Sequence, residues 1–330
     1  MKKPKVLIIS TGGTISSKYD NEKGYSPAVT AQELSSSFLG IDKYADIESM
    51  QFCNVLSFAL EPHQILDLAN LIKAKITEGD CAGAVVTQGT ATMEETSYLA
   101  DLLWDIDKPL VFTGAMLNAS EKDSDGARNI FNSVLVAIDP MAKNKGVLVC
   151  MAGEIHAARD VSKIHKSSLN TFVSLNTGPL GLVSNNRVIF YRNPVLRKVF
   201  APIDRLETNI EIIKVSLGTS SKLIDVLVSN DYKGIVLEGF PGGGGVTPEI
   251  MNCVKKAQDK DIAFVLTPRS PMGSVVSRAS GGCGPWDLYQ CGVISGGDLT
   301  SVKARILLMV TLPLVDNKSE LEKIFNEITP

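Results

Sequence analysis

Hydrophobic positions along this chain fall into two patterns that alternate. Short continuous apolar runs indicate strands that are buried on both faces, and segments with apolar residues at helical spacing indicate amphipathic helices. The predicted strands are residues 5–10, 83–87, 109–113 and 146–151. The predicted helices between and after them are residues 62–77, 92–104 and 126–138. Alternation of this kind predicts an α/β fold with a parallel sheet covered by helices on both faces.

A looser stretch, residues 191–208, carries Pro194, Pro202 and mixed charges, and the alternation then resumes. We interpret this stretch as a linker between an N-terminal domain, residues 1–190, and a smaller α/β domain, residues 209–330. The strands predicted in the second domain are residues 210–216, 234–239 and 263–267. Its predicted helices are residues 220–229, 247–259, 300–312 and 317–328.

Charge and composition narrow the function classes. The chain has 330 residues, a formal net charge of −3 and a pI of about 5.7, which does not favour a nucleic-acid partner. No apolar stretch is long enough for a membrane span, and the apolar run after Lys2-Lys3 is too short for a signal peptide. The six cysteines are scattered without a CxxC pair, so we expect reduced thiols, a cytoplasmic protein and no metal site.

Two loops that follow predicted strands carry the candidate chemistry. Residues 10–17 read STGGTISS and residues 87–95 read TQGTATMEE. Glycines such as Gly13 and Gly89 let the backbone approach a ligand closely, and Thr14 and Thr90 follow them directly. Because ligands of parallel sheets bind beyond the carboxyl ends of the strands, these threonines are candidate nucleophiles or ligands. The simpler interpretation is helix capping, since Thr92 and Glu95 have the spacing of a capping box.

A threonine nucleophile needs a base, and the sequence offers lysine rather than histidine. None of the three histidines lies in a GxSxG-like context, so a Ser-His-Asp hydrolase is not indicated. A lysine that burial keeps neutral can accept the proton instead. Residues 158–168 offer Lys163 and Lys166 for this role, and Asp160 could orient whichever lysine acts.

Taken together, these segments resemble the bacterial-type L-asparaginase family along nearly the whole chain. The family's TGGTI stands at residues 11–15, and its THGTDTMEET is matched by TQGTATMEET at residues 87–96. The other matching segments are GAM at 114–116, SDGARN at 124–129, ARDVSK at 158–163, GPLG at 178–181 and GVISGGDLTSVKARILL at 292–308.

The resemblance implies an amidohydrolase of two α/β domains that acts without a cofactor. Family members are homodimers or homotetramers with the active site at a subunit interface, and they hydrolyse side-chain amides of asparagine or glutamine. By position, Thr14 matches the primary nucleophile and Tyr25 the tyrosine of the loop that closes over the site. Thr90 and Lys163 match the second threonine and its lysine base. Ser57 matches the serine that binds the substrate carboxylate. Ala115 matches the residue whose backbone carbonyl meets the leaving amide.

The sequence departs from the family where the family binds the free α-ammonium of asparagine. The acid that follows the second threonine is Ala91 here, the preceding histidine is Gln88, and the residue after the carboxylate-binding serine is Phe58. A rough alignment places Ser280 where some members contribute a glutamate from a neighbouring subunit. An ammonium that loses its carboxylate partner gives up about 1.5–3 kcal/mol. We therefore expect an Asn- or Gln-like substrate without a free α-ammonium, with Phe58 as an apolar wall or as a core residue.

Three other interpretations stay open at this stage. The chain could be an ordinary L-asparaginase in which another acid, such as Glu61, replaces the missing one. It could also be a non-catalytic homologue that binds an amino-acid derivative. The glycine cluster at residues 242–245 could in principle cradle a phosphate, although a role at an interface fits the family better.

Overall fold

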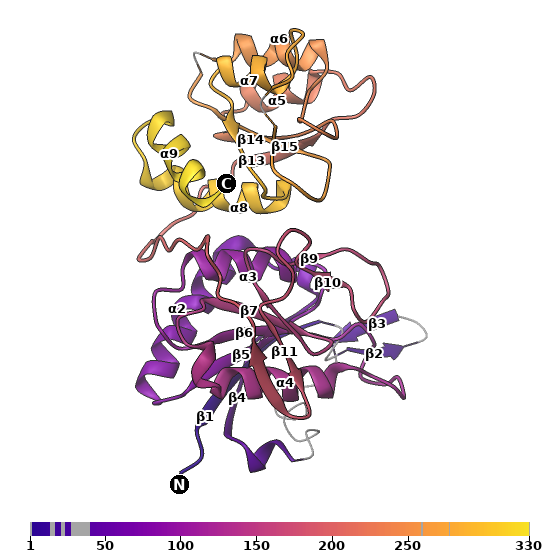
Figure 1. Ribbon diagram of the computed structural model, residues 1–330, viewed down its shortest axis with the longest axis vertical. Coiled ribbons are helices and arrows are strands. Elements are labelled where there is room, and N and C mark those ends of the chain that lie inside the picture. Colours follow the sequence, from indigo (N-terminus) through magenta and orange to yellow (C-terminus); the bar gives the residue numbers. More distant parts are fainter. Residues whose placement is uncertain are drawn as a thin grey trace. The chain divides into compact units, whose positions relative to one another are not determined.

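The chain forms two compact units, Met1–Ala201 and Pro202–Pro330, in a computed structural model (Figure 1). The structure describes residues 2–13, 17–20, 24–27, 40–258, 260–276 and 278–329, with backbone only for 17–20 and 24–27. The boundary between the units falls next to Pro202, and the domain limits given above stay a prediction. None of the described helices combines the length and apolar character that crossing a membrane requires.

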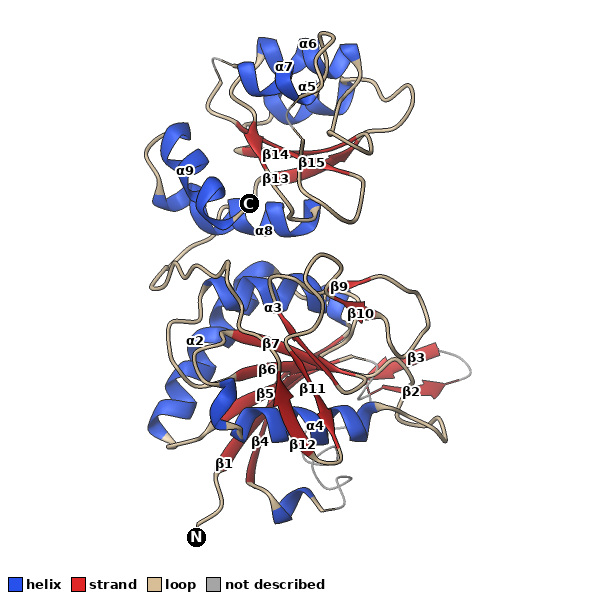
Figure 2. Cartoon of the chain, viewed as in Figure 1, coloured by secondary structure: helices blue, strands red, loops and turns tan. Residues whose placement is uncertain are grey.

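The described part of the first unit is built on an eight-stranded mixed sheet with helices on both faces (Figure 2). Its strands, in spatial order, are β12 (Arg187–Phe190), β11 (Gly181–Ser184), β8 (Glu154–Ala157), β7 (Val147–Met151), β6 (Leu110–Thr113), β5 (Gly83–Thr87), β1 (Lys5–Gly12) and β4 (Asp46–Val55). The five strands from β7 to β4 are parallel, and β8, β11 and β12 continue the sheet in antiparallel pairing. The predicted α/β class and the parallel core of the sheet are confirmed. The antiparallel strands β8, β11 and β12 were not predicted from the sequence.

The alternation of side chains along the central strands explains why helices cover both faces. Val6, Ile8 and Val85 point to one face and pack with residues of α4 (Gly126–Ile138). The strand residues between them point to the other face, which α2 (Pro62–Glu78) and α3 (Met93–Leu102) cover (Figure 1). Because both faces are buried, the strands carry continuous apolar runs, and the N-terminal run forms β1 between β4 and β5.

The second unit has its own parallel sheet and core. The sheet strands are β13 (Ile210–Lys214), β14 (Gly234–Gly239), β15 (Ala263–Pro268) and β16 (Ile294–Ser295), in this spatial order. The described helices are α5 (Lys222–Ser229), α6 (Pro248–Lys256), α7 (Pro285–Gln290), α8 (Ser301–Thr311) and α9 (Lys318–Ile328). Helices α5, α6 and α7 lie over one face of this sheet, and α8 lies over the other (Figure 1). A second, smaller α/β body is therefore confirmed as part of the fold class.

Two small strand pairs and one short turn lie outside the large sheets. A two-stranded sheet joins β9 (Ser162–Lys163) to β10 (Phe172–Val173), and another joins β2 (Ser17–Asp20) to β3 (Gly24–Pro27). A single turn of 3₁₀ helix, Ser57–Ala59, follows β4. These elements place residues 57 and 163 at the carboxyl ends of β1 and β5, where the two threonine loops begin.

Candidate active site

The two glycine-containing loops and the serine turn are in van der Waals contact. A Cβ atom added to Gly13 would lie 2.1 Å from the backbone nitrogen of Gly89, and one added to Gly89 would lie 2.8 Å from Oγ of Ser57. Gly13 also has a φ of +88°, a conformation that L-amino acids with a side chain rarely adopt. Glycine at both positions therefore allows three chain segments to meet, and the Ser57 side chain, which is 3% exposed, lies against Gly89.

A lysine and a threonine from distant segments meet beside this contact. The hairpin of β9 and β10 pairs Lys163 with Phe172, and the Nζ atom of Lys163 donates a hydrogen bond of 2.7 Å to Oγ1 of Thr90. Thr90 is buried, and a Cβ atom added to Gly114 at the end of β6 would lie 3.2 Å from its methyl group. The pair is thus held by the sheet on one side and by the hairpin on the other.

The electrostatic surroundings favour a neutral amine on Lys163. Burial lowers the pKa of the Lys163 ammonium below its ordinary value, and the carboxylate of Glu94 partly offsets this by raising the same pKa. When the amine is neutral, the hydroxyl of Thr90 can donate across the same 2.7 Å contact. This pair can therefore move a proton from the hydroxyl to the amine, which is the step that a threonine nucleophile or a bound water needs.

The structure distinguishes between the accessory residues considered in segment 158–168. Asp160 does not orient the lysine, because its carboxylate accepts hydrogen bonds of 3.0 Å from Nη1 of Arg159 and from Oγ1 of Thr177. Lys166, the alternative base, is exposed, whereas Lys163 is partly buried against Thr90. The sequence of this segment did not distinguish the two lysines. In the structure, the β9–β10 hairpin holds Lys163 in contact with Thr90.

The loop after β6 is fixed by a carboxylate and an amide from the start of α4. Asp125 accepts hydrogen bonds from the backbone nitrogens of Met116 and Leu117, each at 3.0 Å to Oδ1. Asn129 donates to the carbonyl of Gly114 at 3.0 Å and to Oδ2 of Asp125 at 2.9 Å. These bonds hold the fully buried Ala115 directly after Gly114, which lies against Thr90.

Two of the positions that depart from the family motif, residues 58 and 91, are exposed, whereas a third, Gln88, is buried. Ala91 is exposed although Thr90 beside it is buried, and Phe58 is 71% exposed although Ser57 beside it is buried. Phe58 is therefore not part of the core of its own unit. Glu61, the acid considered as a replacement, begins α2 and forms its capping box, with Oε1 of Gln64 accepting from the backbone nitrogen of Glu61 at 2.8 Å.

The side chain of Thr92 does something that the sequence did not indicate. Thr92 is the N-cap residue of α3, yet its hydroxyl makes no capping hydrogen bond, so the predicted capping box is wrong. Its Oγ1 instead donates a hydrogen bond of 3.0 Å to the carbonyl oxygen of Ser57. The two residues are 35 positions apart in the sequence, which explains why no local pattern could reveal this bond.

Comparison with known proteins agrees with this arrangement. The family model "Asparaginase, N-terminal" matches residues 5–196, and "Glutaminase/Asparaginase C-terminal domain" matches residues 209–325. The chain belongs to the asparaginase family. Members of this family are amidohydrolases, and the chain is an asparaginase-like enzyme.

Three relatives of this chain are similar to it over most of its length. L-asparaginase 2 of Escherichia coli (strain K12) is 31% identical over 98% of this chain and 93% of its own length. L-asparaginase of Bacillus licheniformis is 32% identical over 93% of this chain and 95% of its own. The crystal structure of the probable cytoplasmic L-asparaginase from Campylobacter jejuni superposes with a TM-score of 0.88 at 30% identity, covering 98% and 99% of the two chains.

Two predicted catalytic residues of this asparaginase-family chain fall partly or wholly outside the described structure. Thr14 lies outside the described residues. Tyr25 lies in β3, for which the backbone alone is described. Their roles therefore stay predictions, as do the substrate contacts of Gly13, Gly89 and Ser57.

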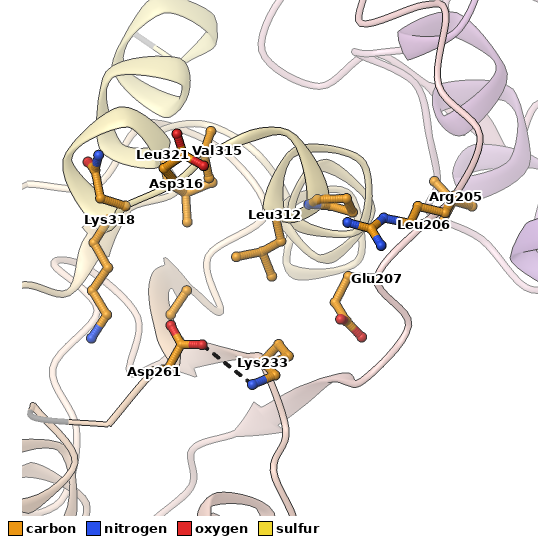
Figure 3. Close-up of a pocket in the computed structure, with 13 residues that line it drawn as sticks. Arg205, Leu206, Glu207, Lys233, Asp261, Leu312, Val315, Asp316, Lys318 and Leu321 are labelled. Atoms are coloured by element: carbon orange, nitrogen blue, oxygen red, sulfur yellow. Dashed lines mark hydrogen bonds and ion pairs between the residues drawn. The ribbon is translucent and has the colours of Figure 1, made fainter.

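Two features of the second unit are a glycine cluster and a cavity. In the glycine cluster, the backbone nitrogen of Gly242 donates to Oγ of Ser270 at 3.2 Å and that of Gly244 donates to the carbonyl of Phe240 at 3.1 Å, which leaves fewer donors for a phosphate. A cavity of about 360 Å³ lies near the amino ends of β14 and β15 (Figure 3). Its ion pair, Lys233 to Asp261 at 3.4 Å, is exposed, and such pairs contribute about 0–1 kcal/mol.

Proposed function

We propose that this chain hydrolyses the side-chain carboxamide of an Asn- or Gln-like molecule that lacks a free α-ammonium, and releases a carboxylate and ammonia. The observation that carries this proposal is the pairing of an intact base with an altered recognition site. Lys163 contacts Thr90 at 2.7 Å, while an exposed methyl group stands at residue 91 where the family has an acid. The reactive pair is equipped for amide cleavage, and the ammonium of a free amino acid has lost its expected partner.

The chemistry follows the threonine route of the family. The hydroxyl oxygen of Thr14 attacks the carboxamide carbon, with Tyr25 accepting the hydroxyl proton and returning it to the leaving nitrogen, so that the C–N bond breaks and ammonia departs. Water then attacks the resulting ester. The Thr90–Lys163 pair accepts a proton from that water and returns it to the threonine oxygen. We assign to Ala115, which is fully buried, the carbonyl that accepts a hydrogen bond from the leaving amide.

Phe58 provides the apolar part of the proposed specificity. Its ring is 71% exposed directly after Ser57, which we assign to the substrate carboxylate, so an acyl group or a larger substituent on the α-nitrogen can pack against the ring. Burying an exposed ring face against such a group stabilises the complex because apolar surface leaves water, at about 25 cal/mol per Å².

Ammonia release from matched substrates tests the proposal. We expect kcat/KM for N-acetyl-asparagine or N-acetyl-glutamine to exceed the value for the corresponding free amino acid. Phe58→Ala should lower kcat/KM for the acetylated substrates about three- to tenfold with little effect on free asparagine, and Phe58→Leu should restore part of the loss. Faster turnover of free asparagine than of every blocked analogue would contradict the proposed specificity.

A second candidate is an ordinary L-asparaginase or glutaminase with a rebuilt ammonium site. The similarity to L-asparaginase 2 of Escherichia coli favours including free asparagine in the assay, and the C-terminal family model, which is shared with glutaminases, favours including free glutamine. A non-catalytic homologue would release no ammonia from any of these amides. We also propose that the chain is cytoplasmic, works as a homodimer or homotetramer, and needs no cofactor.

A further inference from the structure

A small polar network connects the Thr90 loop to the segment that carries Ser57. The hydroxyl of Thr92 donates to the carbonyl oxygen of Ser57 at 3.0 Å and accepts a hydrogen bond from Nε2 of Gln88 at 3.4 Å. The same Gln88 nitrogen donates to Oγ1 of Thr96 at 2.8 Å. Gln88 and Thr96 are buried, so this network is shielded from water and its bonds hold a defined geometry.

Ser57 is held by this network through its backbone carbonyl, and its side chain lies against the backbone of Gly89. Its hydroxyl lies over the Cα atom of Gly89, as shown by the 2.8 Å that would separate Ser57 Oγ from a Cβ atom at Gly89. The carbonyl of the same residue accepts from Thr92. A serine held through its backbone and its side chain keeps one orientation, whereas the single 3₁₀ turn around it, Ser57–Ala59, is too short to be rigid by itself.

We propose that Thr92 is a positioning residue, which fixes Ser57 against the Gly89 loop and thereby sets the affinity for the substrate carboxylate. This inference rests on the proposed function, since it takes Ser57 as the carboxylate-binding group. Thr92 need not touch the substrate, and the proton transfer between Thr90 and Lys163 does not involve its hydroxyl. Its loss should therefore raise KM with little change in kcat.

Steady-state kinetics on five variants separates this role from general stabilisation. Thr92→Val keeps the side-chain shape and removes the hydroxyl, so KM should rise about three- to tenfold, the value of one ordinary hydrogen bond, with kcat within about twofold. Thr92→Ser should restore the wild-type KM. Thr77→Val is the matched control, because its hydroxyl donates to the carbonyl of Lys73 at 2.7 Å on α2, away from this network.

The last two variants, Ser57→Ala and the double variant Ser57→Ala/Thr92→Val, close a double-mutant cycle. In a Ser57→Ala background, adding Thr92→Val should change KM by less than about twofold, because the group that Thr92 positions is already absent. An equal effect in both backgrounds would overturn the inference, as would a fall in kcat at unchanged KM.

Hydrogen exchange of the ligand-free protein tests the same link without any substrate. Backbone amides in the peptide covering residues 55–61 should exchange faster in Thr92→Val than in Thr77→Val, and unchanged exchange would overturn the inference. A wild-type protein that cleaves no amide would refute the proposed function, and the exchange rates would still decide whether Thr92 holds the Ser57 segment.

Discussion

Replacing Ala91 with aspartate tests the central electrostatic claim in one step. The substitution restores a carboxylate at the position where the family binds the α-ammonium. If the methyl group at residue 91 is the reason why free asparagine binds poorly, Ala91→Asp should improve free asparagine relative to its N-acetyl analogue. The acetylated substrate has no ammonium and gains nothing from the new charge.

The size of the effect follows from the exposure of the site. A charge-assisted hydrogen bond contributes about 1.5–3 kcal/mol, and exposure to water weakens it. Because Ala91 is exposed in the described structure, the lower end applies, and about 1.5 kcal/mol corresponds to roughly a tenfold change. The new charge also lies near Lys163 and will raise its pKa, which slows both substrates together. The ratio of the two kcat/KM values removes this common effect.

The assay is ammonia release from free asparagine and N-acetyl-asparagine at fixed pH and ionic strength. Ala91→Asp should raise the free-to-blocked ratio of kcat/KM about tenfold. Ala91→Asn is the control, since it has the same size without the charge, and it should leave most of that ratio unchanged. A ratio that does not move in Ala91→Asp, or that moves as far in Ala91→Asn, would refute the electrostatic reasoning.

Two further predictions concern the base and the stability of the first unit. Since the neutral amine of Lys163 is the proposed base, kcat/KM should rise with pH through the lowered pKa of this lysine. Glu94→Gln should move this rise to lower pH, because the charge that raises the pKa of Lys163 is gone. A pH–rate profile in which Glu94→Gln moves the rise to higher pH would contradict this. Asp101 is buried and accepts from Nε of Arg197 at 2.9 Å, so Asp101→Ala should lower the free energy of unfolding by about 3–5 kcal/mol in urea titration. Asp105→Ala, which breaks an exposed pair, is the control and should cost under about 1 kcal/mol, and an equal loss in both would contradict the reasoning.

The strands that could be predicted from the sequence are those buried on both faces. Residues 83–87 form β5 as predicted, because five consecutive buried positions leave a continuous apolar run. Strand β4 was not predicted, since it lies at the edge of the sheet and its positions alternate between exposed and partly buried. Strands β8, β11 and β12 are only four residues long, which is too short for a period to show. Edge strands carry weaker sequence signals because water covers part of their surface.

The meeting of the two glycine-containing loops was predictable, whereas the hydrogen bonds that connect the site were not. Both loops leave the carboxyl ends of neighbouring parallel strands, so topology alone brings Gly13 to Gly89. The bond from Thr92 to the carbonyl of Ser57 joins a helix start to a turn that no periodicity places. A threonine before a helix matches a capping pattern equally well, and only the fold decides which acceptor lies within reach.

The physical separation of base and recognition site explains how one can change without the other. The basicity of Lys163 is set by its burial and by Glu94, and its position by the β9–β10 hairpin and the hydroxyl of Thr90. The position of the lysine does not depend on the side chain at residue 91, which is exposed. An acid at residue 91 would add charge near the lysine and raise its pKa, so its replacement by alanine also favours the neutral amine. In the proposed function, the alanine at residue 91 therefore both weakens binding of a free amino acid and keeps the base active at lower pH.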